Sequence, residues 1–79
     1  MSQHDMILQQ QIAVKRQERA SAVIAAKAAL RALSEVAFYA RTKPVEEINT
    51  AEMTAHLEQL ISRQEDVQRI DSEIKELEY

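Results

Sequence analysis

The sequence predicts an all-α protein in which two long helices fold back on each other as an antiparallel, coiled-coil-like hairpin. Three observations support this prediction. The 79 residues include no glycine and one proline, Pro44, so a single strong helix breaker interrupts the chain. On each side of Pro44, apolar residues recur at spacings of three and four. Residues that favour helices dominate the composition, and a chain of this length forms one domain, residues 1–79.

The first helix is predicted to run from about residue 3 to residue 41. Ser2, followed three residues later by Asp5, resembles the capping box that begins many helices. No breaker follows until Pro44. Arg41 and Lys43 place positive charge near the C-terminal end of the helix, where it complements the helix dipole.

The loop between the helices is predicted at about residues 42–49, and the second helix at about residues 50–77. Pro44 disfavours helical geometry at the residue before it. With Glu46 and Glu47 after it, a short helical turn that has Pro44 at its first position is expected. Asn49, with Glu52 three residues later, is a second capping-box signal. Two helices joined by so short a loop pack as antiparallel neighbours.

Charge is divided unevenly between the two helices. Residues 1–43 carry a net charge of +4 and residues 44–79 a net charge of −7, which together give the −3 of the chain. With the turn near residue 46, residues whose numbers add to about 92 face each other. We therefore predict that Lys15, Arg16 and Arg19 face the acidic segment 71–78, of the same chain or of a second copy.

The first helix is apolar over more of its circumference than one neighbouring helix can cover. One row of its side chains is predicted to pack on the second helix: Val23, Ala26, Leu30, Leu33 and Ala37. The residues expected to receive this row are Leu60, Val67 and Ile74. An adjacent row is predicted to pack on a second copy: Ala22, Ala25, Ala29 and Val36. Nine alanines between residues 20 and 40 allow two backbones to approach closely, which favours a homodimer built as a four-helix bundle. A bulky charged residue in place of Ala29 is then predicted to split the dimer.

The predicted register leaves an apolar cluster at the start of the first helix without a partner on the second. Its residues are Met6, Ile7, Leu8 and Ile12. Because exposed apolar clusters usually mark contacts, we expect this cluster either to pack on the second copy or to bind a third protein.

No pattern in the sequence predicts a catalytic, cofactor-binding or metal-binding site. Without glycine or cysteine, the chain has no phosphate-binding loop, disulfide or thiolate ligand. His4 stands near the N-terminus, and His56 follows Glu52 by four residues, which is too few ligands for a metal site. No serine stands in a pattern with a histidine, so we expect a protein that is not an enzyme and needs no cofactor.

These features predict a protein–protein interaction module, such as an assembly factor, small chaperone, adaptor or inhibitor, that acts through an apolar helix face. An RNA- or DNA-binding dimeric bundle using Lys15, Arg16 and Arg19 is the alternative. The net charge of −3 and the absence of aromatic residues among the basic ones disfavour that alternative. Lys27, Arg31 and Glu35 interrupt the most apolar segment, so no membrane span is expected and the cytoplasm is the expected location.

Overall fold

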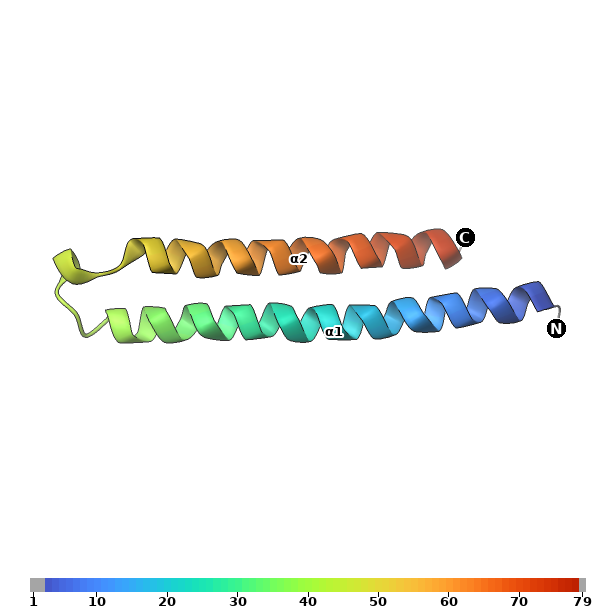
Figure 1. Cartoon of the computed structure of the whole chain (residues 1–79), viewed down its shortest axis with the longest axis horizontal. Helices are drawn as coiled ribbons and strands as arrows, with labels where there is room; N and C mark the ends of the chain where they lie inside the picture. Colours follow the sequence, from blue (N-terminus) through green and yellow to red (C-terminus); the bar gives the residue numbers. More distant parts are fainter. Residues whose placement is uncertain (1–2, 79) are drawn as a thin grey trace.

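The computed structural model describes residues 3–78, which form two long helices and a short connection. The order of elements is α1 (Gln3–Ala40), the 3₁₀-helix η1 (Val45–Glu47) and α2 (Thr50–Glu78). The two long helices run antiparallel and side by side, and the chain forms a rod of 65 × 15 × 12 Å (Figure 1). The described residues contain no strand. The predicted all-α helical hairpin is therefore confirmed.

Helix α1 continues for 38 residues, or about 57 Å, because no glycine or proline interrupts it. It ends at Ala40, one residue before the predicted end. The N–H groups of Arg41, Thr42 and Lys43 donate to carbonyls three residues earlier, at 3.2–3.3 Å. The Thr42 hydroxyl also donates to the Tyr39 carbonyl, at 2.9 Å. This tightened turn satisfies the last carbonyls without a left-handed residue, and no described residue has a positive φ. Ser2, the predicted N-cap, lies outside the described residues.

The connection contains the predicted short turn, but Pro44 precedes it as the N-cap, so the prediction of Pro44 at its first position is wrong. Pro44 has extended backbone angles, φ −54° and ψ 145°, and its carbonyl accepts a hydrogen bond from the Glu47 N–H at 2.9 Å. Asn49 then begins α2 as predicted, because its side-chain Oδ1 accepts a hydrogen bond from the Glu52 N–H at 3.0 Å. This bond satisfies one of the unpaired N–H groups in the first turn of α2.

Replacing Asn49 by alanine is expected to lower the free energy of unfolding by about 1 kcal/mol, because the first turn of α2 loses its side-chain acceptor. Urea unfolding followed by circular dichroism measures this change. Asn49→Asp keeps the acceptor and should stay within about 0.5 kcal/mol of the wild type. Equal losses in both variants would show that the Asn49 cap does not stabilise α2.

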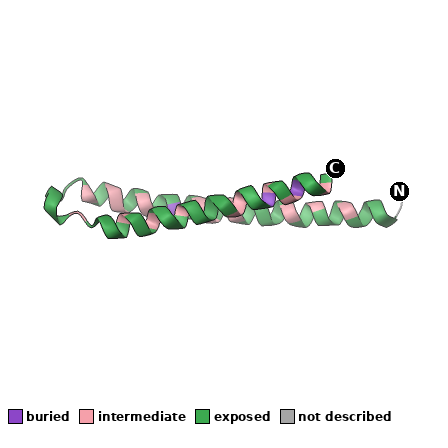
Figure 2. Ribbon diagram, turned by 90° about the horizontal axis from the view of Figure 1, so that it is seen from above, coloured by how far each residue is buried: buried purple, intermediate pink, exposed green. Residues whose placement is uncertain are grey.

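The contact between the two helices is formed mainly by apolar side chains. Among residues 3–78, three apolar residues are buried, namely Ala29 of α1 and Ile70 and Ile74 of α2. Half-buried residues continue the same stripe on α2: Met53, His56, Leu60, Val67 and Leu77. On α1 a row of half-buried residues continues the contact: Leu8, Ile12, Lys15, Ala22, Ala26, Leu33, Val36 and Ala40. Val23, Ala25, Ala32 and Ala37, which flank this row, are half-buried as well. Most of the remaining surface is exposed (Figure 2).

The seam on α1 runs between the two predicted rows and takes residues from both. Ala29, assigned from the sequence to a second copy, is buried against α2 within one chain, so that assignment is wrong. Leu30, assigned to the intrachain row, lines a groove with Leu60 and Val67 of α2 but is 48% exposed, so it lies at the edge of the contact. Ala22 of α1 lies beside Ile70 of α2, and a small residue there lets the two backbones approach.

Candidate interaction surface

The basic cluster of α1 is paired with acidic residues of α2. Lys15 binds the Glu73 carboxylate. Nη2 of Arg16 lies 3.0 Å from Oε1 of Glu78. The last pair brings Nε of Arg19 to 2.5 Å from Oδ1 of Asp71. The prediction that this cluster faces the acidic segment 71–78 is therefore confirmed, within a single chain.

The Lys15–Glu73 pair shifts the pKa values of both of its groups. The hydrogen bond to Glu73, helped by Glu18, raises the pKa of the Lys15 ammonium above its ordinary 10.5. The same hydrogen bond, helped by the positive charges of Lys15 and Arg69, lowers the pKa of the Glu73 carboxyl below its ordinary 4.5. The folded hairpin therefore favours the charged form of each group.

These shifts predict how the stability of the hairpin depends on pH. The lowered pKa of Glu73 gives stability that is present above pH 4.5 and is lost as the pH falls through the folded-state pKa. The raised pKa of Lys15 gives stability that is present below pH 10.5 and is lost as the pH rises through the folded-state pKa. Urea midpoints of the wild type and of Glu73→Gln should therefore differ most between about pH 5 and pH 10 and converge outside that range. A difference independent of pH would contradict the pairing.

One flank of the hairpin carries exposed aliphatic side chains from both helices. An open groove of 330 Å³ lies along it, lined by Val23, Ala26, Lys27, Leu30, Leu60, Gln64, Val67 and Gln68. Leu57 and Ile61 precede Gln64 by seven and three residues, so they lie on the same side of α2. They are 46% and 44% exposed. We call the set of Val23, Leu30, Leu57, Leu60 and Ile61 the aliphatic flank.

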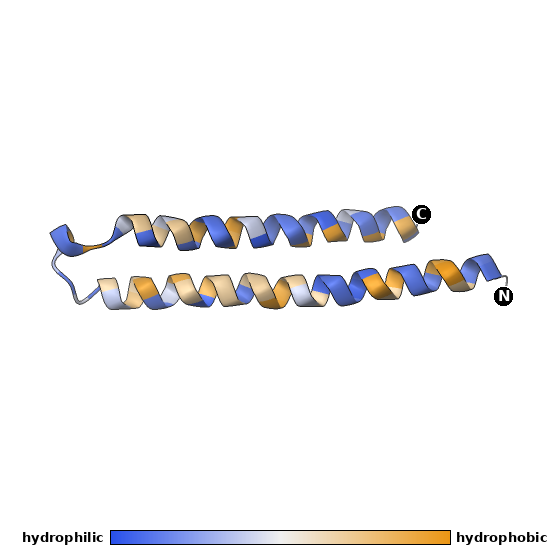
Figure 3. Ribbon diagram, in the orientation of Figure 1, coloured by the Kyte–Doolittle hydropathy of each residue, from blue (hydrophilic) through white to orange (hydrophobic). Residues whose placement is uncertain are grey.

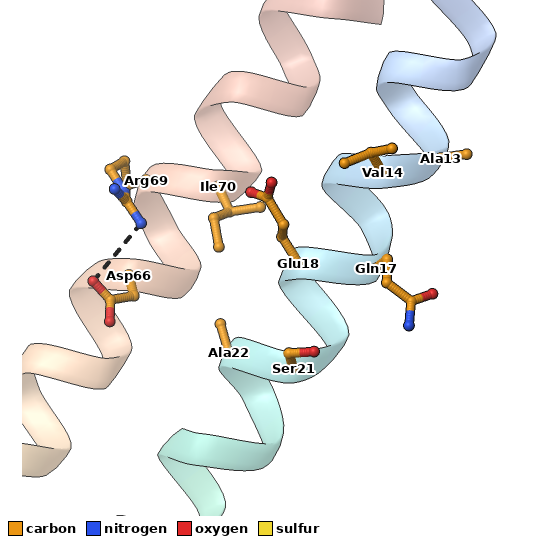
Figure 4. Close-up of a pocket in the computed structure, with 9 residues that line it drawn as sticks. All are labelled: Ala13, Val14, Gln17, Glu18, Ser21, Ala22, Asp66, Arg69 and Ile70. Carbon is orange, nitrogen blue, oxygen red and sulfur yellow. Dashed lines mark ion pairs between the residues drawn. The ribbon is translucent and has the colours of Figure 1, made fainter.

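The opposite flank holds a larger groove with a charged rim. This groove of 640 Å³ is lined by Ala13, Val14, Gln17, Glu18, Ser21, Ala22, Asp66, Arg69 and Ile70 (Figure 4). Nη2 of Arg69 lies 3.9 Å from Oδ1 of Asp66, and Oε2 of Glu18 lies 3.3 Å from Nζ of Lys15. Ile70 and Ala22 lie between the helices, whereas Gln17 points away from α2 (Figure 4). The charged residues of this flank are thus already paired.

The predicted N-terminal apolar cluster is divided by the structure. Met6 and Ile7 are exposed, whereas Leu8 and Ile12 are half-buried on the seam side of α1. Leu77 of α2 lines the same groove of 460 Å³ as Ile7. The prediction that the whole cluster lies beyond α2 is therefore wrong, because Leu8 and Ile12 are half-buried and Leu77 of α2 reaches the level of Ile7.

The residues considered for chemistry do not converge on one site. His4 is exposed at the start of α1, and Nε2 of His56 lies 3.9 Å from Oε1 of Glu52. Within residues 3–78, no three histidine, aspartate or glutamate side chains are grouped closely enough to hold a metal ion. Neither described helix is long and apolar enough to cross a membrane.

Three kinds of exposed residue were not predicted from the sequence to form a functional surface. Leu57 and Ile61 complete the aliphatic flank, and their spacing from Gln64 was the available signal. Ile24 stands on the back of α1, 71% exposed. Phe38 and Tyr39 form an exposed edge-to-face pair near the loop, with ring centroids 5.8 Å apart. Figure 3 shows that α1 is the more apolar helix, with orange running through its middle toward the loop, whereas α2 is mostly blue.

Comparison with known proteins gives no match for this chain. No protein-family model matches the sequence, and neither curated proteins nor solved structures give a match.

Proposed function

We propose that the protein is a non-enzymatic protein–protein interaction module that works by self-association, with two hairpins forming a four-helix bundle. The observation that carries this proposal is the imbalance between buried and exposed apolar residues. Among the described residues, only Ala29, Ile70 and Ile74 are buried, whereas ten large hydrophobic residues are exposed. A hairpin with so small a core gains stability when a neighbour covers its exposed apolar side chains.

The surface area of the chain supports the same proposal. The chain has a mass of 9.0 kDa and exposes 6346 Å². A compact monomer of that mass exposes about 4,850 Å², so the hairpin exposes about 1,500 Å² more than expected. A standard protein–protein interface removes about 800 Å² from each partner. The excess is therefore large enough for at least one interface of ordinary size.

Within such a bundle, the exposed start of α1 offers a place for a third protein. Met6 and Ile7 lie far from the loop, and the groove beside them is open. The classes of function that fit are an assembly factor, a small chaperone, an adaptor or an inhibitor, because each acts by covering apolar surface on another protein. None of them requires a catalytic group.

The ion pairs weigh against nucleic-acid binding as the main function. Lys15, Arg16 and Arg19 each hold a carboxylate of α2, so binding phosphate would first require breaking those pairs. The Arg16 and Arg19 pairs are exposed and are individually worth only about 0–1 kcal/mol, so their main effect is to orient the helices.

The proposal is tested by absolute mass from light scattering during size-exclusion chromatography, over a hundredfold range of protein concentration. We expect twice the 9.0 kDa of one chain, with dissociation only at the lowest concentrations if at all. A mass of one chain at every concentration would overturn the proposal of self-association. In that case the exposed apolar residues would form the binding surface for a different protein.

A further inference from the structure

We infer that the second copy docks on the aliphatic flank. Leu30 and Ile61 of each chain lie at the centre of the interface. This inference rests on the proposed function and adds the surface through which self-association occurs. It selects one side of the hairpin from the three that a second copy could cover, which are the two flanks and the back of α1.

The first reason is that the aliphatic flank is built by both helices. Leu30 of α1 and Leu60 of α2 line one groove, and Ile61 lies on the same side of α2. A helix of a second hairpin seated along this groove contacts α1 and α2 at once, as neighbours do in a four-helix bundle. The back of α1 offers no such groove, because Ile24 stands there without a contribution from α2.

The second reason is charge. In a two-fold dimer each flank packs on its own copy, so like charges on a flank repel their symmetry mates. The groove of the aliphatic flank contains one charged residue, Lys27, which makes no ion pair within residues 3–78. Its long apolar stem can lie along the interface while the ammonium reaches water. The opposite groove brings Glu18, Asp66 and Arg69 to its rim, and these would have to be desolvated.

The third reason is the size and exposure of the side chains. Leu30, Leu57 and Ile61 are each between 44% and 48% exposed, so a neighbour can still bury a large part of every one. In the opposite groove Val14 is 58% exposed, but Ser21 and Ala22 beside it are small and offer less apolar area to a partner. The aliphatic flank therefore offers a partner more large apolar side chains to cover.

The test compares two flank variants, Leu30→Glu and Ile61→Glu, with a matched control, Ile24→Glu. All three introduce the same charge at an exposed aliphatic position of a helix. Sedimentation equilibrium gives the dissociation constant of the dimer, and circular dichroism gives the helical content at the same concentrations. The flank variants should raise the dissociation constant about 30-fold or more, as expected for a residue at the centre of an interface. The control should remain dimeric.

Each outcome has a defined meaning. A flank variant that loses helix while Ile24→Glu stays dimeric and helical supports the inference, because one chain alone leaves Leu30 and Ile61 exposed. A wild-type dimer that persists in both flank variants, or that Ile24→Glu splits, overturns the inference but leaves self-association standing. A wild-type chain that is monomeric throughout overturns both proposals, and the flank then belongs to a different protein.

Discussion

Replacing Ile70 by alanine is expected to lower the free energy of unfolding by about 2–4 kcal/mol, the range found for large-to-small changes in protein cores. Ile70 is the most buried residue of the hairpin, with 4% of its surface exposed. Among residues 3–78 the other buried residues are Ala29 and Ile74, so few neighbours can move in to fill the space. Thermal unfolding followed by circular dichroism should show a melting temperature lower by about 10 °C or more.

Ile24→Ala is the matched control for this substitution. It removes the same atoms from α1 at a position that is 71% exposed, so the change should stay within about 0.5 kcal/mol. Equal losses at the two positions would mean that the helices do not meet at Ile70. The seam described for α2 would then be incorrect.

Replacing Ala29 by leucine is expected to destabilise the hairpin by about 1–3 kcal/mol, although leucine is more hydrophobic. Ala29 is 9% exposed and lies in the contact of α1 with α2. A larger side chain there forces the backbones apart and disturbs packing along the seam. A charged residue at this position should open the hairpin itself, in contrast to the sequence-based prediction that it would only split a dimer.

Ala28→Leu gives the comparison for this second substitution. Ala28 precedes Ala29 on the same helix but is exposed, so leucine there should change the free energy of unfolding by no more than about 0.5 kcal/mol. Urea unfolding of both variants at one protein concentration separates the two effects. A stable Ala29→Leu hairpin would show that α1 is rotated away from the described seam.

The parts of the fold that local chemistry controls could be predicted from the sequence. Pro44 and Asn49 determine the backbone conformation of the residues next to them. The end of α1 and the start of α2 therefore follow from residue type and spacing. The register of the two helices could also be predicted from the sequence, because a short loop fixes which residues lie opposite each other. The ion pair of Arg19 with Asp71 has residue numbers that add to 90, close to the predicted sum.

The rotation of α1 about its own axis could not be predicted in the same way. Two apolar rows lie side by side on this helix, and hydrophobicity alone favours the row with the larger residues, such as Leu30. The structure instead turns Ala29 toward α2, because close packing depends on the combined volume of facing side chains. That volume is a property of the pair of helices and is not visible in the pattern of either one.

The candidate surface was predictable only in part for the same reason. Val23 and Leu30 were expected at an interface, whereas Leu57 was expected in the stripe of α2 that packs on α1 and Ile61 was assigned to no stripe. Once α1 is rotated to place Ala29 at the seam, Leu30 moves out to the flank. A surface made by two helices could be recognised only after their rotation was known.

The antiparallel arrangement also has a consequence for how the molecule would respond to a pulling force. Gln3 and Glu78 lie toward the same end of a rod 65 Å long, with the loop at the other end (Figure 1). Tension applied between these two ends would separate the helices one turn at a time, loading Arg16–Glu78 before Arg19–Asp71. Tension applied between one end and the loop would load the whole seam in shear. The same hairpin would therefore open under a small force in the first direction and resist a much larger force in the second.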